Sequence, residues 1–339
     1  MRIAVDAMGG DHAPHVQVEG ALMAAAERPD LAIALVGPTE LVGQELARHG
    51  AGAARFELID APETIGMEES PAAAVRRKPR SSIVVAARLQ REGRSDALVS
   101  AGNTGAAVAA SLLEMGRLQG VSRPAIAIYL PNPYGGAIVL DVGANAEAKP
   151  VNLLQFAIMG ELYARLVLKH DRPKIGLLNI GEESSKGSEL YQEGHRLLAE
   201  SAINFVGNVE GRDMFAGVAD VVVCDGFVGN VLLKFAESMG SHIFTLLRAE
   251  LRRSLRAKAG ALLLKAAFTG LTRRMDYAEY GGAPLLGVDG VTIIAHGSSS
   301  PKAMKNAVIA AARLVESGAN RGIQERLESH AASGGSARG

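Results

Sequence analysis

Short apolar runs alternate with helix-like segments along most of the chain. The first runs cover residues 2–5, 31–36 and 56–59, and residues 16–27 and 40–49 between them have the spacing of helices. Strands and helices that alternate at this spacing indicate a parallel sheet with right-handed crossovers. The pattern therefore predicts an α/β fold of three layers, α/β/α, around a mostly parallel sheet.

Two later stretches break this alternation. Residues 123–130 and 137–141 flank an Asn-Pro-Tyr-Gly-Gly turn and predict a β-hairpin, of the kind that often forms an edge or a dimer contact. Within residues 231–274, leucines stand four residues apart beside a row of arginines, and Gly260 interrupts the pattern. This stretch predicts a basic amphipathic helical hairpin over residues 240–275, with an apolar turn.

The helical hairpin has two interpretations. It packs against another subunit, or it lies on an anionic bilayer. Both hold if the base of the hairpin dimerises while its tip touches lipid. The candidate lipid contacts are Leu255, Leu262, Leu263, Leu264 and Phe268.

Composition narrows the class of protein. The 339 residues are 48% hydrophobic but only 4% aromatic, so Ala, Val, Leu and Ile must build the core, as buried parallel strands prefer. The formal net charge is zero, which gives no indication of a nucleic-acid partner. The single cysteine, Cys224, excludes a disulfide within the chain and fits a reducing cytosol.

The domain organisation follows from the same pattern. We expect one α/β domain over residues 1–327, either as one body or as two subdomains around a central cleft, with the helical hairpin as an insertion. Residues 328–339 are rich in Ser, Gly and Ala and predict a disordered tail. The first apolar run is too short for a signal peptide, and no apolar run is long enough to span a membrane. A cytoplasmic protein is therefore expected.

Five loops, each after an apolar run, carry the candidate chemistry. They are rich in Gly, Asn and Ser, and the carboxyl ends of strands in an open parallel sheet are where ligands bind. We therefore expect these loops to form one polar cleft at one edge of the sheet. The candidate phosphate or substrate ligands are Gly102, Asn103, Thr104, Gly105, Asn145, Ser184, Ser185, Ser188 and Ser298.

The loop at residues 181–188, Gly-Glu-Glu-Ser-Ser-Lys-Gly-Ser, is typical of an anion site. It joins an apolar run to a helix, so free backbone N–H groups and the positive end of the helix dipole point into it. Lys186 adds a full positive charge. The Walker A order GxxxxGK[ST] is not met, so nucleotide hydrolysis is not the first hypothesis. The alternative is a strand-to-helix turn with a serine N-cap.

A local positive patch follows a Ser-Pro helix start. It is either a solvated loop or a docking site for an acidic partner or an anionic substrate. Its four residues are Arg76, Arg77, Lys78 and Arg80. In the first turn of the chain, Asp6, Asp11 and His12 have no diagnostic ligand spacing, so no metal site is predicted there.

Nine segments in this order resemble the PlsX family of bacterial phosphate acyltransferases over residues 1–324. They are MRIAVDAMGGDHAP, MEESPAAAVRRK, SIVVAARL, VSAGNTGA, DVGANAEAKP, GEESSKGSELYQEG, GNVEGRD, VCDGFVGNVLLKFAE and AHGSSSPKA. Two positions depart from the family. Ala148 stands where a cysteine is common, so a thiol there is not essential, and Pro79 interrupts a stretch that often continues as a charged helix.

The resemblance implies transfer of a fatty acyl group from acyl carrier protein to inorganic phosphate, which gives acyl phosphate for phospholipid synthesis. It implies a fold similar to that of phosphotransacetylase and of isocitrate and isopropylmalate dehydrogenases, and no organic cofactor. It further implies a homodimer, cytosolic or peripherally membrane-associated, with a glycerol-3-phosphate acyltransferase as a downstream partner. The acidic carrier protein would dock on the positive patch or on the arginines of the hairpin.

The loops supply groups for this chemistry, in which phosphate attacks a thioester without an enzyme nucleophile; G-x-S-x-G is absent. Lys186 holds phosphate. Asn103, Asn230 and backbone N–H groups are candidate donors to the tetrahedral oxyanion. Lys186 or His296 protonates the leaving thiolate, and Asp225 orients Lys186 or accepts a proton from phosphate.

Each of these assignments has a structural alternative. Lys186 pairs only with Glu182 or Glu183, Asp225 only caps the following helix, and the two asparagines and His296 are turn residues. Three competing functions also stay open. An NAD(P)-dependent dehydrogenase is disfavoured because no GxGxxG follows a strand. A non-catalytic membrane adaptor would not need five polar loops, and a short-chain phosphotransacetylase that uses coenzyme A shares the chemistry.

Overall fold

The computed structural model describes residues 1–50, 56–264, 266, 268, 270 and 280–335. The strands are β1 (Arg2–Asp6), β2 (Ala32–Gly37), β3 (Glu57–Asp60), β4 (Ala97–Ser100), β5 (Ala125–Leu130), β6 (Ala137–Leu140), β7 (Ile175–Leu178), β8 (Phe205–Val209), β9 (Val221–Val223), β10 (Ala283–Leu286) and β11 (Thr292–Ile294). The helices are α1 (His15–Glu27), α2 (Thr39–Arg48), α3 (Pro71–Arg77), α4 (Ser82–Arg91), α5 (Thr104–Glu114), α6 (Pro150–Leu166), α7 (Glu189–Ala199), α8 (Gly226–Arg252), α9 (Leu255–Leu263), α11 (Pro301–Ser317) and α12 (Ala319–Gly335). The expected alternation of strand and helix is confirmed.

The described strands form one sheet in the order β3-β2-β1-β4-β11-β10-β5-β6-β9-β7-β8. Pairing is parallel from β3 to β11 and again from β6 to β8, and antiparallel at β11–β10, β10–β5 and β5–β6. The sheet is therefore mostly parallel, as predicted. The β5–β6 hairpin is also confirmed, but it lies inside the sheet and not at an edge.

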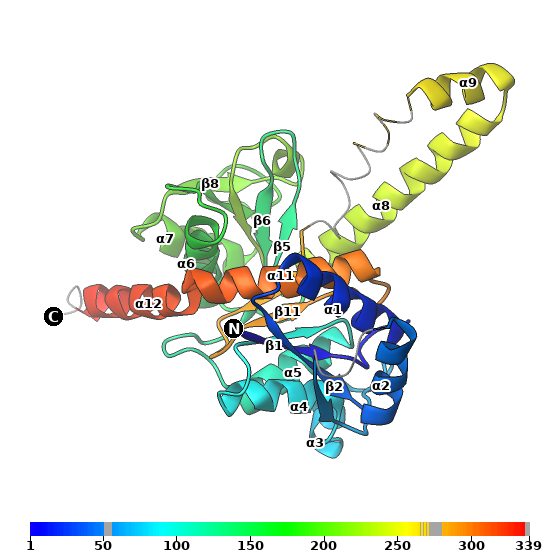
Figure 1. Cartoon of the computed structure of the whole chain (residues 1–339). Coiled ribbons are helices and arrows are strands. Elements are labelled where there is room, and N and C mark those ends of the chain that lie inside the picture. Colours follow the sequence, from blue (N-terminus) through cyan, green and yellow to red (C-terminus); the bar gives the residue numbers. More distant parts are fainter. Residues whose placement is uncertain (51–55, 265, 267, 269, 271–279, 336–339) are drawn as a thin grey trace.

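Alternate side chains of the strands point to opposite faces of the sheet. In β1, Ala4 packs into the core cluster under α3, α4 and α5, while Ile3 and Val5 pack into the cluster under α1 and α11. A third cluster joins β5, β6, β7 and β9 to α6 and α12. Helices thus cover both faces of the sheet, which gives three layers (Figure 1). The core cluster beneath α5 also includes side chains from the first turns of α8.

Strand direction divides the polar loops between two edges of the sheet. The three antiparallel pairings between β11 and β6 are an odd number, so β6, β9 and β7 run opposite to β4 and β11. The expectation that all five loops share one edge is therefore wrong. The two edges that carry the loops are nevertheless close to each other at the centre of the sheet. The central strand β10 has only four residues, so its two ends are about 13 Å apart.

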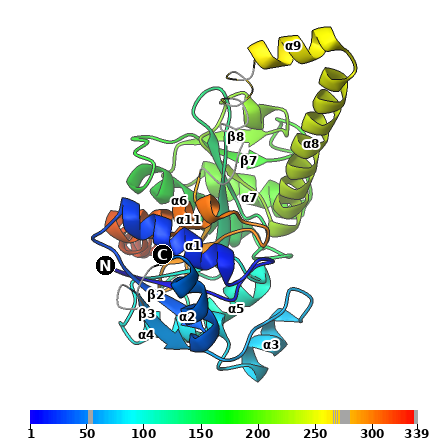
Figure 2. The same cartoon turned by 45° about the vertical axis from the view of Figure 1, so that its right-hand side comes forward.

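The helical hairpin differs from its prediction in where it turns. Its first arm is α8, which begins directly after β9, and the turn lies at Arg253 and Ser254, where Ser254 Oγ caps α9 by accepting from Ala257 N at 3.1 Å. Gly260 lies inside α9, and the apolar leucines follow it at the end of that helix. Figures 1 and 2 both show α8 projecting away from the sheet. Residues 265, 267, 269 and 271–275 of the predicted hairpin lie outside the described residues.

The C-terminal segment is helical where a disordered tail was expected. Helix α12 starts at Ala319 and continues to Gly335, and only residues 336–339 of the predicted tail lie outside the described residues. A helix that is already nucleated extends at little cost through Ala-rich sequence such as His-Ala-Ala. The Ser and Gly content of the segment therefore did not outweigh the helix before it.

Candidate active site

Two groups of loops carry the predicted site residues. The first loop group consists of residues 6–14, 63–70, 101–103 and 295–300. The second loop group consists of residues 141–149, 179–188, 208–213 and 224–230. Hydrogen bonds join loops within each group: Asn103 Nδ2 donates to Met67 O in the first group, and Asn208 Nδ2 donates to Glu183 O in the second. Both groups flank the same core cluster, because α5 leaves the first group and α8 leaves the second, and both pack on it.

A buried carboxylate organises the start of the first loop group. Ser100 Oγ donates to Asp6 Oδ2 at 2.7 Å and accepts from Gly102 N at 3.1 Å. A Cβ on Gly9 would lie 2.5 Å from Asp6 Oδ2 and 2.7 Å from Gly102 N, so the close approach requires glycine. Burial raises the pKa of Asp6, and the hydrogen bond from Ser100 opposes this shift. Asp6 therefore ties the β1 and β4 loops together.

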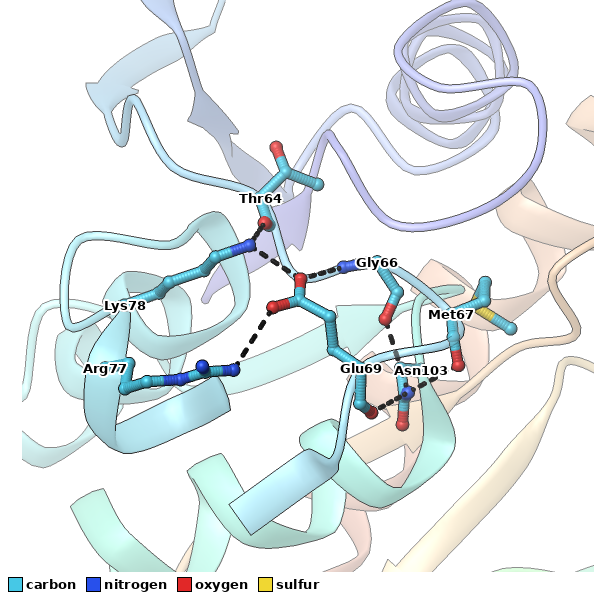
Figure 3. A network of polar contacts seen from close by, with 7 residues as sticks. All are labelled: Thr64, Gly66, Met67, Glu69, Arg77, Lys78 and Asn103. Carbon is cyan, nitrogen blue, oxygen red and sulfur yellow. Dashed lines mark hydrogen bonds and ion pairs between the residues drawn. The ribbon is translucent and has the colours of Figure 1, made fainter. Parts of the chain in front are cut away.

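Asn103 is the N-cap of α5 and also holds the neighbouring loop. Its Oδ1 accepts from Ala106 N at 3.0 Å, while its Nδ2 donates to the carbonyls of Met67 at 2.9 Å, Glu69 at 3.3 Å and Gly66 at 3.4 Å (Figure 3). The side chain is buried. Both N–H groups of the Asn103 amide thus donate to backbone oxygens, so neither is left for an oxyanion. This arrangement agrees with the alternative that Asn103 is a turn residue.

The basic patch is largely neutralised by internal pairs. Lys78 Nζ donates to Glu69 Oε1 at 2.6 Å and to Thr64 O at 2.8 Å, and Arg77 lies 3.7 Å from the same carboxylate (Figure 3). The Lys78 ammonium lowers the pKa of the Glu69 carboxyl. Arg80 pairs with Asp60 at 3.4 Å. The patch is thus a folded turn in which Lys78 is structural.

Arg76 differs from the other three basic residues of the patch. It is exposed in the last turn of α3, and it forms no ion pair with the part of the chain that the structure describes. Helix α3 ends at Arg77 before Pro79, so the charged segment does not continue as one helix. Of the predicted docking residues, Arg76 is therefore the cation that is open to a partner.

The loop after β11 closes the first loop group. Asp11 N donates to Gly297 O at 2.9 Å, and His296 Nδ1 lies 2.8 Å from Ser298 Oγ. His296 and Ser298 are both exposed, and Ser300 caps α11 by accepting from Ala303 N at 3.2 Å. His296 is therefore a turn histidine that remains accessible to solvent.

Asp141 is the centre of the second loop group and was not predicted. Its carboxylate accepts from the backbone N–H groups of Ile126, Gly143, Ala144 and Asn145 at 2.8–3.1 Å, and from Asn145 Nδ2 at 2.8 Å. Burial raises its pKa, against the effect of these donors. Asn145 Nδ2 also donates to Pro124 O at 2.6 Å. The Asn145 side chain is thus spent on shaping the loop.

Asp225 caps α8 and holds a tyrosine. Its Oδ1 accepts from Phe227 N and Val228 N, both at 2.9 Å, and its Oδ2 accepts from Tyr191 Oη at 2.6 Å. Burial, and then this hydrogen bond, raise the pKa of Tyr191. Asp225 thus caps α8, and among the described residues its carboxylate contacts groups other than Lys186.

Lys186 lies in an exposed loop at the start of α7. Ser184, Ser185 and Ser188 are exposed beside it, and the Lys186 ammonium makes no ion pair or hydrogen bond to any described residue. The alternative of a pair with Glu182 is not realised, because Glu182 lies 3.2 Å from Arg212. A cation and three hydroxyls therefore face solvent at a helix N-terminus.

Asn230 is the other predicted donor with an open side chain. It is half-buried on the second turn of α8, and its Oδ1 lies 3.5 Å from where a Cβ on Gly143 would be. Its amide makes no hydrogen bond to a described residue. Gly229 permits this placement, since a Cβ there would lie 1.9 Å from Asp141 O. Asn230 thus faces the backbone N–H groups that Asp141 gathers.

A cavity of about 300 Å³ lies elsewhere in the fold. Tyr129, Tyr163, His170, Tyr280 and Arg313 are among its lining residues, and α6 and α11 supply two of them. Burial raises the pKa of Tyr163 to about 12. None of the predicted site residues lines this cavity.

The comparison with known protein families decides the family. A family model described as fatty acid synthesis protein matches residues 1–321. The chain belongs to the fatty acid synthesis protein family. A phosphate acyltransferase of Heliobacterium modesticaldum is 56% identical over 328 residues, covering 96% of this chain and 98% of that one. A phosphate acyltransferase of Pelotomaculum thermopropionicum is 51% identical, covering 97% and 96%.

Solved structures show the fold that this fatty acid synthesis protein shares. A phosphotransacetylase from Streptococcus pyogenes has a TM-score of 0.63 at 19% identity, covering 93% of this chain and 94% of that one. The EutD phosphotransacetylase from Staphylococcus aureus has a TM-score of 0.61 at 17% identity, with the same coverage. The expectation of a phosphotransacetylase-like fold is confirmed.

Sequence reasoning missed two residues that shape the site of this fatty acid synthesis protein. Asp141 ends β6 before Val-Gly-Ala-Asn, and a carboxylate followed by small residues is a signal for a loop that folds around it. Tyr191 lies on α7, far along the chain from Asp225, and nothing local to it indicates the contact. The first was recoverable from its motif, and the second required the fold.

Proposed function

We propose that this chain transfers a fatty acyl group from acyl carrier protein to inorganic phosphate, giving acyl phosphate for phospholipid synthesis. Family membership and the phosphate acyltransferase names of the relatives support the reaction class. The observation in the structure that carries the proposal is the Lys186 loop. It offers exposed serine hydroxyls and an ammonium without an ion pair to any described residue at the N-terminus of α7, which is the arrangement that binds a phosphate.

The mechanism needs two binding functions. Lys186 and the loop of Ser184, Ser185 and Ser188 hold hydrogen phosphate, so that one of its oxygens attacks the thioester carbonyl. A C–O bond forms, and the carbonyl oxygen becomes an oxyanion that Asn230 Nδ2 stabilises. This assignment passes over Asn103 and Asn145, whose side-chain donors are already engaged.

Collapse of the intermediate breaks the C–S bond. The products are acyl phosphate and the thiol of the carrier arm, and the proton of hydrogen phosphate ends on sulfur. Lys186 is the group we assign to carry that proton, since Asp225 is occupied. His296 lies in the other loop group, and it acts only if the carrier arm enters from that side.

The experiment uses radiolabelled phosphate with long-chain acyl carrier protein as the donor. We expect label in a lipid-soluble product that hydroxylamine destroys, because an acyl phosphate is a mixed anhydride. The same assay with short-chain acyl coenzyme A is the comparison. Label only with coenzyme A would replace the proposal by a phosphotransacetylase function, and no label with either donor would overturn acyl transfer to phosphate.

Carrier docking and oligomeric state are finer parts of this proposal. Arg76 is the exposed cation that we assign to binding of the acidic carrier protein.

An exposed apolar stripe runs along α8 at spacings of three to four residues, and burying each side chain would contribute about 1.5–3 kcal/mol. Its residues are Phe227, Val231, Phe235, Met239, Ile243 and Leu246. We assign this stripe to a second copy of the chain in a homodimer.

The end of α9 is the proposed lipid contact. Leu262, Leu263 and Leu264 are exposed, Leu263 at 86%, and Lys258 lies on the same helix. None of the described helices combines the length and apolarity needed to cross a bilayer. We therefore propose peripheral binding, in which the leucines enter the interface of an anionic membrane; Phe268 extends the predicted set, and the side chain of Leu255 lies outside the described residues.

Two substitutions, each of which introduces a negative charge, test the dimer interface and the lipid contact separately. Phe235→Asp should convert a dimer to monomer in analytical ultracentrifugation, while Leu263→Asp should abolish flotation with anionic liposomes and leave the dimer intact. If Phe235→Asp remained dimeric, the stripe would not be the interface. If Leu263→Asp floated like the parent, the lipid contact would lie elsewhere.

A further inference from the structure

Two histidines and a buried glutamate converge between α1 and α2, away from both loop groups. His15 Nδ1 lies 2.8 Å from Glu45 Oε1, and His49 Nε2 lies 3.3 Å from the same oxygen. The two imidazole rings are stacked, with centroids 5.7 Å apart. His15 is the first residue of α1, and Glu45 and His49 are four residues apart on and after α2.

The spacing of these groups fits a metal ion. One ligand atom from each of the three side chains lies within 4.8 Å of the others. A zinc ion bonds imidazole nitrogen and carboxylate oxygen at about 2.0–2.2 Å, so its tetrahedral ligands stand about 3.3–3.5 Å apart. Small rotations of the two rings would therefore place the three atoms at ligand distance. His15 is exposed, which leaves room for a water as the fourth ligand.

The surroundings favour an oriented ligand set. The Glu45 side chain is only 6% exposed, and both His15 Nδ1 and His49 Nε2 approach its Oε1. On the outer side of His15, Nε2 lies 3.7 Å from Glu19 Oε2, and such a carboxylate commonly fixes the ring of a metal-bound histidine. Arg48 is 74% exposed and lies 2.9 Å from the other carboxylate oxygen of Glu45, Oε2. This ion pair therefore does not occupy Oε1, which is the oxygen that would bind the metal.

We propose that His15, Glu45 and His49 form a binding site for a zinc ion or a similar divalent transition metal. Imidazole and carboxylate are ligands suited to this class. The site joins the first residue of α1 to the end of α2. Since α1 directly follows the loop whose Asp11 N donates to Gly297 O, the metal fastens one end of the first loop group. This inference does not depend on the proposed acyl transfer.

The test is a zinc titration of untagged, metal-stripped protein in competition with a chromophoric chelator. We expect one high-affinity zinc per chain, weakened more than about 100-fold in His15→Gln and in His49→Gln, because a lost ligand should exceed the 10–100-fold effect of an outer partner. Glu19→Gln should weaken binding by about tenfold. Cobalt(II), bound in place of zinc, should show visible absorption bands that both histidine variants lose.

The matched control is His195→Gln, a histidine on α7 that packs against Phe205 and lies outside the cluster. It should bind zinc like the parent. Melting of every variant without metal shows that it is folded. Zinc should raise the melting temperature of the parent and of His195→Gln equally, that of Glu19→Gln less, and those of His15→Gln and His49→Gln least. The proposal is wrong if the parent binds zinc no more tightly than the His15→Gln/His49→Gln double variant, or if His195→Gln is weakened as much as His15→Gln.

Discussion

Asn103 of the first loop group caps α5 through its side-chain oxygen, and its amide nitrogen donates to three carbonyl oxygens. In the second loop group, the ammonium of Lys186 has no partner among the described residues. Both residues lie in small-residue loops between a strand and a helix. Asn103 is buried and holds backbone together, and Lys186 is exposed and open to a ligand.

This difference shows that a polar residue in a Gly-rich loop predicts the loop more surely than it predicts a ligand contact. A buried amide must satisfy its own donors, so the fold uses them first. An exposed ammonium carries no such requirement. Chemistry should therefore depend most on Lys186, and stability should depend most on Asn103.

The largest effect is expected for Lys186→Ala. Removing the cation that we propose to bind phosphate should lower kcat by about 100-fold or more, which corresponds to about 2.7 kcal/mol or more of lost transition-state stabilisation. The melting temperature should stay near that of the parent, because the ammonium makes no ion pair or hydrogen bond with the described residues. Steady-state kinetics and calorimetry measure the two quantities. Lys174→Ala, at the other end of β7, is the control, and equal kinetics for the two variants would break the comparison.

Asn103→Ala tests the other side of the comparison. Loss of the cap costs about 1 kcal/mol and loss of the donors to three carbonyls about 1–3 kcal/mol more, so unfolding in urea should show a deficit of about 2–4 kcal/mol. Asn103→Ser keeps a capping oxygen and should fall between the parent and Asn103→Ala. Unchanged stability with a large fall in kcat would instead make Asn103 a substrate ligand.

Tyr191→Phe examines whether the second loop group also contains a structural contact. The hydroxyl donates to a carboxylate, so its loss should cost about 1.5–3 kcal/mol near neutral pH. The folded protein raises the pKa of Tyr191, chiefly by burial, and therefore holds this proton more tightly than the unfolded chain does. That contribution is complete below about pH 10, the ordinary tyrosine pKa, and declines as pH rises above it.

Urea unfolding at pH 8 and at pH 10.5 measures the effect. The stability gap between the parent and Tyr191→Phe should narrow at the higher pH, because only the parent loses this contribution. Tyr134→Phe, at a tyrosine that is 76% exposed, is the control and should leave the parent's pH dependence unchanged. A gap that widened with pH would contradict the assigned direction.

The smallest effect is expected for Arg76→Glu. Reversing one exposed charge should raise the KM for acyl carrier protein by about three- to tenfold at low ionic strength, and the difference should shrink as salt screens the interaction. The values of kcat and of stability should be unchanged. Arg172→Glu, an exposed charge before β7, is the matched reversal, and an equal change in both variants would remove the docking assignment.

The fold was largely predictable because its apolar runs are strong signals, but its strand directions were not. Ala283–Leu286 was not recognised as a strand, since it is short and contains Pro284, and its two antiparallel pairings set the direction of half the sheet. The loops were found individually from their glycines and asparagines. Their division into two groups depends on the pairing of β10 with β5, whose partners Leu285 and Ile126 lie more than 100 positions apart, and no local pattern records that pairing.

Among the site residues, the sequence could identify loops but not the partners of side chains. Lys186 stood out because a charge amid small residues is unusual, and its exposure agrees with that. Asp225 and Asn145 follow strands in the same way, yet their partners, Tyr191 and Pro124, come from other elements. Whether a polar group is free or engaged is a property of packing, and so it appears only in three dimensions.

Helix α8 joins the second loop group to the far end of the hairpin as one continuous rod. Its 27 residues span about 40 Å, so it acts as a ruler that sets how far the site stands from whatever surface holds the tip. It also sets a rotational phase. Removing seven residues would shorten the ruler by about 10 Å with the phase nearly kept, whereas removing two would swing the tip by about 200° for only about 3 Å. The length of this helix therefore sets both the distance and the orientation of the second loop group relative to the tip of the hairpin.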